Sequence, residues 1–434
     1  MIAIVTTACG TTRKPAAAVK FINRWQMYLH NNLSQKVNVM PLLQTHSNQP
    51  DLICLSHLRW NFVFQRPQHL MSRFARVRRV FFVEEPVFEP AAKPFLQAAL
   101  CPHTNVHVLT PHLSCEADRN LVVSELLTQF AVSNNIKKPV VWFYTPMALE
   151  FFPKSIVPAA VVYDCMDELS MFRGASQQLQ TLETHLLDIA DLVFTGGISL
   201  FEAKRKMHSR VYAFPSGVDV HHFQQARTLR GDFHEHQGMG RPRLGYAGVI
   251  DERIDLSLLA EVAKQRPRWQ IVMIGPTAKI SPDDLPRPAN IHWLGMKDYR
   301  DLPAYFGGWD VGIMPFALND ATRFISPTKT PEYLAAGLPV VSTPIRDVVR
   351  PYGELGLVRI GHSTEEFIDA AEQAMVQSMS IKWRQRSDEF LKSLSWDSVW
   401  NEMDGLIAGV LNPHDSVRRA GQLAAAAREE ITRV

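Results

Sequence analysis

The sequence predicts an α/β protein made of two parallel-sheet domains in tandem. Short apolar runs of strand length alternate with amphipathic helical patterns, which is typical of parallel sheets covered by helices on both faces. The alternation occurs twice, and a polar stretch without periodicity, residues 224–241, separates the two series. A chain of 434 residues is long enough for two or three domains. We therefore expect two α/β domains of similar size joined by a linker.

The first series of predicted strands runs from Asp51 to Gly197. Helical patterns lie between several of these strands, for example at residues 66–77 and 180–191. Residues 217–223, GVDVHHF, follow the series and are interpreted as a turn. The strand candidates are DLICLS (51–56), RVFFVEE (79–85), NVHVLT (105–110), PVVWFY (139–144), AAVVYD (159–164) and DLVFTGG (191–197).

The second series has the same organisation. DLSLLAEVAKQ (255–265) and DLPAYFGG (301–308) are predicted helices between its strands. DSVWNEMDGLIAGVL (397–411) is a late amphipathic helix, and a charged, Ala-rich tail follows at 412–434. The strand candidates are PRLGYAG (242–248), WQIVMIG (269–275), NIHWLG (290–295), DVGIMPF (310–316), PVVST (339–343) and LGLVRI (355–360).

Composition argues against several classes of protein. A net charge of +3 is small for a dedicated nucleic-acid binder, so we expect no nucleic-acid partner. The five cysteines include no CxxC pair, which argues against a zinc or thiol redox motif and fits a reduced cytosol. No apolar run reaches about 18 residues, so we expect no membrane-spanning helix and predict a cytoplasmic protein.

The N-terminal segment, residues 1–47, differs from the rest of the chain. Residues 1–50 contain no Asp or Glu but five Lys or Arg residues, and apolar residues recur at helical spacing between Val19 and Leu29. A basic amphipathic helix can lie on an anionic membrane, which would place the protein at the inner membrane face. The alternative, which we favour, is an extension ahead of the folded domain. The short run IAIV lacks a preceding basic residue, so we expect no cleaved signal peptide.

Glycines end three predicted strands of the second series: Gly248, Gly275 and Gly295. Ligands of open parallel sheets bind beyond the carboxyl ends of the strands. Glycine at such a position lets a ligand approach the backbone closely. Glycine also ends many strands simply because the following turn requires it. A single glycine is therefore weak evidence, and only the three together indicate a nucleotide-binding site.

The stretch SPTKTPEYLAAGLPVVST, residues 326–343, joins a hydroxyl-rich loop to a short helix and a strand. Pro331 suits the first helical position with Thr330 as its cap, and Gly337 can end the helix. A helix N-terminus attracts phosphate. Glu332 can then accept two hydrogen bonds from a ribose diol, or it merely complements the helix dipole. The groups available to a diphosphate are those of Ser326, Thr328, Lys329 and Thr330, with Arg323 nearby.

Several nucleotide-binding motifs are missing from the sequence. There is no Asp-x-Asp pair, so we expect neither a bound metal ion nor a cofactor. There is no GxxxxGK[ST] loop, which excludes a P-loop enzyme, and no GxGxxG follows the first strand of either series, which argues against a nicotinamide dehydrogenase.

These residues together resemble the GT-B fold glycosyltransferases, close to the large retaining family of bacterial mannosyl- and glucosyltransferases. The resemblance covers about residues 48–410 and is carried by GYAGVIDERIDLSLL, IVMIGP, IHWLGMKDYRDLPAYFGGWDVGIMPF, SPTKTPEYLAAGLPVVST and PSGVDVHHF. It implies an acceptor-binding domain at 48–223, a nucleotide-sugar domain at 242–398 and a crossover helix at 399–411, all facing a cleft between two Rossmann-like sheets.

The same resemblance assigns roles to residues of the second half. Glu332 matches the family's ribose-binding glutamate, and the loop 326–330 would hold the diphosphate. Arg253 lies near the place of the family's phosphate-binding lysine. The backbone around Leu294, Gly295 and Met296 would meet the base.

Two departures from the family pattern stand out. A second glutamate is often found eight positions before Glu332, near the transferred sugar, and here that position is Phe324. The glycine-rich acceptor loop is replaced by SHLRWNFVFQRPQHLMSRFA, residues 56–75. Together with YDCMDELSMFRG, residues 163–174, this segment resembles a subgroup of bacterial surface-polysaccharide transferases of teichuronic-acid type.

These two segments supply the predicted acceptor-binding residues. Trp60 can stack on a sugar, and basic side chains can contact phosphate or hydroxyls. Clustered carboxylates can bind hydroxyls or raise one another's pKa, or simply cap a helix. His69 and Asp167 are the catalytic candidates, although His69 also fits a helix surface, and the donor phosphate can take the acceptor proton instead. The candidates are Arg59, Trp60, Arg66, His69, Asp164 and Asp167.

We therefore predict a metal-independent hexosyltransferase that moves a sugar, with retention, from a nucleotide-sugar donor, UDP-linked by family habit, to a saccharide or lipid-linked acceptor. Its place would be in cell-surface polysaccharide or glycoconjugate synthesis. Two alternatives stay open. One is a nucleotide-sugar epimerase or hydrolase on the same fold, and the other is a catalytically silent nucleotide-sugar-binding protein, which Phe324 keeps in consideration.

Overall fold

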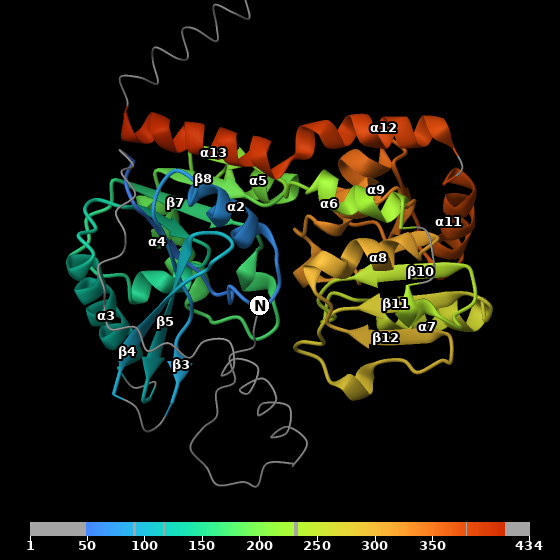
Figure 1. The fold of residues 1–434 in the computed structure, drawn as a ribbon, viewed down its shortest axis with the longest axis horizontal. Coiled ribbons are helices and arrows are strands. Elements are labelled where there is room, and N and C mark those ends of the chain that lie inside the picture. Colours follow the sequence, from blue (N-terminus) through green and yellow to red (C-terminus); the bar gives the residue numbers. More distant parts are fainter. Residues whose placement is uncertain (1–48, 90–92, 116–117, 230–232, 379, 413–434) are drawn as a thin grey trace, which may run out of the picture.

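The computed structural model describes residues 49–89, 93–115, 118–229, 233–378 and 380–412. They form two α/β domains side by side (Figure 1). The predicted N-terminal extension lies outside the described residues, and so does the predicted tail apart from Asn412. Among the helices that are described, none combines the length and the apolar character needed to cross a membrane.

Within the described residues, the first domain is built on a nine-stranded sheet with the order β3-β5-β2-β1-β6-β7-β8-β9, and β4 also pairs with β5. The β4–β5 pair is antiparallel and the other pairs are parallel. Its strands are β1 (Leu52–Leu55), β2 (Val80–Val83), β3 (Val87–Phe88), β4 (Phe95–Leu100), β5 (Val106–Leu113), β6 (Val140–Phe143), β7 (Ala160–Cys165), β8 (Leu192–Thr195) and β9 (Val211–Ala213).

The second domain has a six-stranded sheet, counted over the described residues, with the order β12-β11-β10-β13-β14-β15, and every pair in it is parallel. The strand order reverses between β10 and β13, as it does between β1 and β6 in the first domain. Such a reversal is where open α/β sheets bind ligands. Its strands are β10 (Arg243–Ala247), β11 (Gln270–Ile274), β12 (Ile291–Gly295), β13 (Val311–Met314), β14 (Val340–Ser342) and β15 (Val358–Ile360).

The two-domain α/β fold and all twelve predicted strands are confirmed. Strands such as β1, β2 and β6 are buried along their whole length, which is why each reads as a continuous apolar run. The prediction missed β3, β4 and β9. Strand β4 is mostly exposed at the sheet edge, and β3 has only two residues, so neither carries a burial pattern in its sequence.

The helices cover the sheets and connect their strands. Helix α13 runs along the first domain and α12 along the second, so that together they line one side of the molecule (Figure 1). The helices are α2 (Arg66–Phe74), α3 (Arg119–Ser133), α4 (Leu179–Ile189), α5 (Ile198–Lys204), α6 (Val220–Gln224), α7 (Leu256–Gln265), α8 (Leu302–Gly307), α9 (Lys329–Ala335), α10 (Arg346–Val348), α11 (Thr364–Gln377), α12 (Ile381–Leu391) and α13 (Trp396–Leu411).

The interpretation of residues 217–223 as a turn is wrong, because most of this stretch belongs to the short helix α6. The side chain of Asp219 caps α6 by accepting a hydrogen bond from the backbone N–H of His222 at 3.1 Å. Phe223 of α6 and Ala226, which follows the helix, both join the hydrophobic core of the second domain. A five-residue helix is too short to show apolar periodicity, which explains the error.

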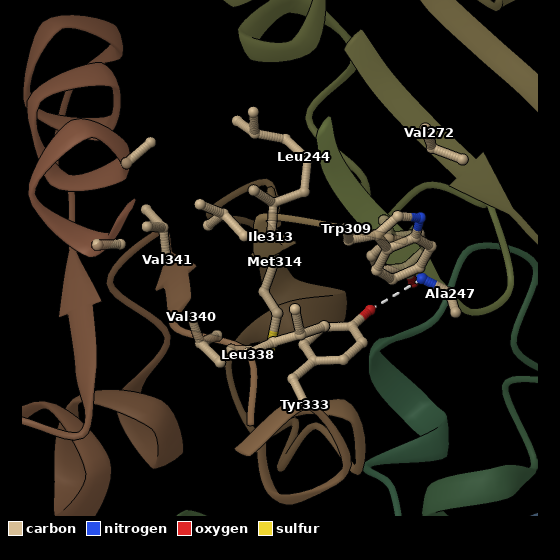
Figure 2. Close-up of a cluster of buried hydrophobic side chains, with 14 of the residues drawn as sticks. Leu244, Ala247, Val272, Trp309, Ile313, Met314, Tyr333, Leu338, Val340 and Val341 are labelled. Carbon is tan, nitrogen blue, oxygen red and sulfur yellow. Dashed lines mark hydrogen bonds between the residues drawn. The ribbon is translucent and has the colours of Figure 1, made fainter. Parts of the chain in front are cut away.

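The core of the second domain lies between the sheet and α9 (Figure 2). Tyr333 of α9 is fully buried, and its hydroxyl accepts a hydrogen bond from the N–H of Ala247 at 2.8 Å. Trp309 packs flat against Gly245, where a Cβ atom would lie only 1.9 Å from the indole. These contacts fix α9 against the end of β10.

The chain crosses between the domains twice, and the two crossings lie side by side. Val218 forms a parallel bridge with Ser395, and its N–H donates to the carbonyl of Leu394 at 2.7 Å. A Cβ atom on Gly217 would lie 2.8 Å from the backbone nitrogen of Trp396. After the second crossing, α13 packs its buried face into the core of the first domain.

Candidate functional site

Residues that follow strands of one sheet contact residues that follow strands of the other. The ring of Phe172, after β7, lies 5.6 Å from the guanidinium carbon of Arg253, after β10, and 4.8 Å from Nζ of Lys279, after β11. Phe64, after β1, packs on Tyr299, after β12, with 5.0 Å between ring centroids. The carboxyl edges of both sheets therefore meet at the domain interface, where the sequence predicted the site.

Helix α9 begins at Lys329, earlier than expected. Thr328 occupies the cap position without a side-chain cap bond, so the predicted cap by Thr330 is wrong. The Thr330 hydroxyl is buried and contacts Sδ of Met314 at 3.3 Å, which turns it away from any ligand in this structure. Pro331 is the third helical residue, where its missing N–H costs no intrahelical bond.

Lys329 and Glu332 form an ion pair across the first turn of α9, with 2.7 Å between Nζ and Oε2. Glu332 is 7% exposed and Lys329 is half-buried. Burial raises the pKa of Glu332, while the charge and hydrogen bond of Lys329, and His222 nearby, oppose the rise. Lys329 and Glu332, the two residues predicted to bind the nucleotide, thus lie side by side, and in this structure they pair with each other.

The surroundings of Glu332 hold its helix in place. Tyr333 anchors α9 to β10, and Arg227 donates to the carbonyls of Ala335 at 2.8 Å and Leu334 at 3.4 Å near the helix end. Gly337 adopts φ +76°, the left-handed conformation that ends the helix as predicted. Arg227 lies in the stretch expected to be a linker, so sequence reasoning missed its role.

Two of the strand-end glycines have a structural reason of their own. A Cβ atom on Gly275, which has φ +143°, would lie 1.8 Å from the carbonyl oxygen of Gly248. Gly295 has φ +68° and no atom within 4 Å of a built Cβ, so space is open beside it. Leu294 is half-buried against the domain core, whereas Met296 is 39% exposed. Of the predicted base contacts, Gly295 and Met296 are the accessible ones.

Arg253 is held by Asp251 through hydrogen bonds of 2.7 to 3.1 Å. Burial alone would lower the pKa of Arg253, but these bonds and the charge of Asp251 raise it. Lys279, which the sequence analysis did not single out, lies beside it and contacts Glu252 at 3.5 Å. Sequence reasoning had a signal available, because Lys279 lies in the loop after β11, four residues beyond Gly275.

Three of the residues predicted to bind the acceptor lie in the interior of the first domain. Arg66 and Asp164 form a bidentate pair at 2.9 and 3.0 Å, with side chains 2% and 0% exposed. Burial raises the pKa of Asp164, and the Arg66 guanidinium opposes the rise. Trp60 is 5% exposed and packs edge-on against Phe82. The expected contacts of these three with an acceptor are corrected accordingly, because a sugar cannot reach them in this structure.

The remaining acceptor candidates lie closer to the interface. Arg59 is half-buried and pairs with Glu84 at 3.0 Å. His69 is 6% exposed and stacks on Trp396 with 4.5 Å between ring centroids. Burial lowers the pKa of His69 well below its usual value, and the nearby Arg73 and Lys329 charges lower it further, so the imidazole is neutral. A neutral His69 carries no charge for a phosphate.

Asp167 is a half-buried carboxylate of the first domain that feels the charges of both Arg253 and Asp251. Burial raises the pKa of Asp167 and the Arg253 charge opposes the rise. The loop that carries Asp167 is fixed by Lys204, whose Nζ lies 2.7 Å from both Glu168 Oε2 and Glu183 Oε1. This buried triad was not predicted, because its members are far apart in the sequence.

A cavity of about 610 Å³ lies elsewhere, at the amino ends of the second sheet. Its lining includes Pro242 before β10, Asp310 before β13 and Pro339 before β14. It is therefore distinct from the predicted donor site. Within the described residues, no group of three or more His, Cys, Asp or Glu side chains is placed to hold a metal ion.

Comparison with known proteins identifies relatives of the second domain and of the whole fold. Residues 241–377, which include β10–β15 and α9, match the family described as Glycosyl transferases group 1. The chain is 26% identical over 268 residues to a protein of Bacillus subtilis (strain 168) whose name, TuaH, assigns it to teichuronic acid biosynthesis as a glycosyltransferase. The match covers 56% of this chain and 65% of that relative, less than two thirds of its length.

Solved structures share the fold at low sequence identity. Sucrose-phosphate synthase from Thermosynechococcus elongatus is 13% identical, with a TM-score of 0.63 and coverage of 84% of this chain and 100% of that chain. HepE from Anabaena, solved in complex with UDP and glucose, is 14% identical, with a TM-score of 0.59 and coverage of 83% and 100%. The chain therefore has the two-domain GT-B fold, and its second domain is a glycosyl transferase group 1 domain.

Proposed function

We propose that this protein is a glycosyltransferase that moves a sugar from a UDP-linked donor to a saccharide or lipid-linked acceptor, with retention and without a metal ion. Its place would be in the synthesis of cell-surface polysaccharide at the cytoplasmic face of the membrane. The group 1 domain and the relative named for teichuronic acid biosynthesis support the transferase class. The neighbour solved with UDP and glucose supports the choice of nucleotide.

The ion pair of Lys329 with Glu332 carries the proposal. It lies at the start of α9, on the connection that follows β13, beside the strand reversal of the second sheet. A pair of opposite charges that satisfies itself at 2.7 Å can exchange partners without leaving a buried charge alone. Lys329 would turn to the diphosphate and Glu332 would accept both hydroxyls of the ribose.

The proposed chemistry follows from what the site can supply. Lys329 and Arg253 offer positive charge to a diphosphate leaving group, and the backbone N–H groups of Ser326 and Thr328 offer donors, since Pro327 between them has none. The leaving phosphate would take the proton of the acceptor hydroxyl as the new glycosidic bond forms on the same face. Asp167, which is half-buried, would orient the acceptor from the first domain, whereas His69 is as buried as Trp60 and is covered by Trp396, so we assign it no contact with the acceptor.

Phe324 favours a second candidate, a nucleotide-sugar-binding protein without transfer. Its ring packs against the core of the first domain, so this position offers no carboxylate to the donor sugar. The two candidates share the donor site and differ only in whether sugar moves.

A two-stage experiment tests the proposal. A thermal-shift screen of UDP-, GDP-, ADP- and dTDP-sugars identifies the donor, and we expect UDP-sugars to raise the midpoint of unfolding most. Transfer to bacterial saccharide and lipid-linked extracts is then followed with the labelled donor, and NMR reads the anomeric configuration of the product. Failure of every nucleotide sugar to bind contradicts the proposal. Binding without transfer to any extract supports the silent binding protein instead.

A further inference from the structure

The first turn of α5, in the first domain, lies against the second domain. Asp347, which follows β14, accepts hydrogen bonds from the backbone N–H of Ser199, at 3.0 Å to Oδ1 and 3.3 Å to Oδ2. Asp347 is 5% exposed and Ser199 is 1% exposed. A carboxylate of one domain therefore satisfies the start of a helix in the other, out of contact with water.

The residue before α5 brings the predicted diphosphate loop into the same contact. A Cβ atom on Gly197 would lie 2.1 Å from Oδ2 of Asp347 and 2.7 Å from Cβ of Ser326. Only a residue without a side chain allows this approach. Ser326, which heads the loop 326–330, is thus held against the first domain beside Asp347.

Two further contacts surround this point. Glu202, one turn along α5, pairs with Arg346 and lies 3.5 Å from Arg350. Phe324, two residues before Ser326, packs against a hydrophobic cluster of the first domain. The surface pairs of Glu202 are half-exposed and contribute little, so the buried Asp347 contact dominates.

We propose that Asp347 is a positioning residue that couples closure of the two domains to the shape of the diphosphate loop. The residues Gly197, Ser199, Ser326 and Asp347 are here called the interdomain clasp. When the clasp is formed, Ser326 is fixed and the backbone N–H groups of Ser326 and Thr328 are presented in one arrangement. Because binding and conformation are linked, a ligand that contacts the loop shifts the equilibrium toward the formed clasp. Loss of the clasp must then lower the affinity for that ligand by the factor by which the formed clasp had raised it.

The inference rests on the proposed function in one respect, that the loop binds diphosphate. It also makes a distinction that the proposed function does not. UDP contacts the loop, whereas uridine reaches only Glu332 and the base contacts. Loss of Asp347 should therefore weaken UDP and leave uridine almost unchanged, although both ligands use the same site.

The experiment compares Asp347→Ala and Asp347→Asn with the wild type by calorimetry. We expect Asp347→Ala to weaken UDP roughly fivefold or more and to change uridine less than twofold. Asp347→Asn keeps one acceptor oxygen for Ser199, so it should recover part of the loss. The matched control is Asp191→Ala, which removes a carboxylate bond of 2.8 Å to the N–H of Val161 inside the first domain and should leave both affinities unchanged.

A distance measurement tests the clasp without any ligand. Spin labels at Val132 and Val376, which are 78% and 65% exposed on separate domains, report the interdomain distance in a background with Cys9, Cys101 and Cys115 replaced by serine. We expect a broader or longer distance distribution in Asp347→Ala, and UDP should narrow it in the wild type.

The outcomes separate the two proposals. Wild-type protein that binds no UDP overturns the proposed function, while a changed distance in Asp347→Ala still supports the clasp. An unchanged distance in both Asp347 variants, or equal losses of UDP and uridine, overturns the clasp. If Asp347→Ala does not fold, as judged by thermal unfolding, Asp347→Asn alone decides between these results.

Discussion

The proposed donor side of the second domain and the proposed acceptor side of the first domain use charged residues in opposite ways. In the second domain, Lys329 and Glu332 are three positions apart and form an ion pair that, in the proposed function, separates to bind the donor. In the first domain, Arg66 and Asp164 are 98 positions apart and are buried completely against each other. A charged residue after a strand thus indicates a ligand only when its partner is local or when it stays accessible.

The sharpest way to break this comparison is to remove one member of the interior pair. Asp164→Ala should cost about 3 to 5 kcal/mol in the free energy of unfolding, because it leaves the Arg66 guanidinium buried without a counter-charge. Urea unfolding followed by circular dichroism measures the loss. The control is Lys392→Ala, which breaks an exposed pair with Glu389 and should cost less than about 1 kcal/mol.

If Asp164→Ala instead folds with wild-type stability and loses only acceptor binding, the pair belongs to the functional site after all. The contrast between an interior pair in the first domain and a ligand-binding pair in the second would then be wrong.

The donor pair should behave in the opposite manner, with a large effect on binding and a small one on folding. Glu332→Ala should weaken UDP and uridine about tenfold or more, since a charge-assisted hydrogen bond contributes about 1.5 to 3 kcal/mol. Lys329→Ala should weaken UDP more than uridine. Calorimetry with both ligands measures this, and Glu332→Gln should recover only part of the loss.

Glu365→Ala is the matched control for Glu332→Ala. It removes an acidic residue from the first turn of α11 in the same domain, away from the interface. It should have only a small effect on stability and none on either affinity. Unchanged uridine affinity in Glu332→Ala would show that Glu332 merely complements its helix, as Glu365 does.

A smaller effect on the same residue should appear with pH. Burial raises the pKa of Glu332, and only its carboxylate form can accept both ribose hydrogen bonds. Affinity for uridine should therefore be constant at pH values above this raised pKa and fall as the pH drops through it. Below that pH, Glu332 of the free protein is protonated and must lose its proton before uridine can bind. Uridine is the probe because UDP carries titrating phosphates of its own.

Calorimetry over a pH series measures this dependence. Glu332→Gln cannot titrate and should give a flat profile. A wild-type profile that is flat down to the range of an ordinary glutamate would contradict the role of burial at this position.

The smallest effect is expected from removal of metal ions. The sequence has no Asp-x-Asp pair, and the start of α9 with Lys329 and Arg253 offers charge for a diphosphate. Transfer should therefore proceed equally in EDTA and in Mg²⁺. Loss of transfer in EDTA, restored by Mg²⁺ or Mn²⁺, would show that the donor side lacks enough charge of its own.

Local patterns explain which parts of the fold could be predicted. Buried strands such as β1 and β6 are continuous apolar runs, and β13 lies inside its predicted range but ends at Met314, two residues earlier than predicted. Strand β4 could not be predicted, because its mostly exposed residues carry no alternation and only pairing with β5 makes it a strand.

The same distinction holds for the site. The place of Glu332 in the first turn of α9 follows from nearby residues, and the structure keeps it there. Trp60 was predicted to be an exposed platform, but contact with Phe82 from another strand buries it. The Asp347 contact with Ser199 joins residues 148 positions apart, so no local pattern reveals it.

The paired chain crossings at Val218 and Ser395 restrict how the two domains can move. Because both covalent connections pass through one hydrogen-bonded point, the domains can swivel about that point but cannot slide past each other. The stack of His69 on Trp396 lies next to this pivot and should be displaced little by such a rotation. The displacement produced by a rotation grows with distance from the pivot. A rotation of a few degrees therefore separates the two domains most at the residues farthest from Val218 and Ser395.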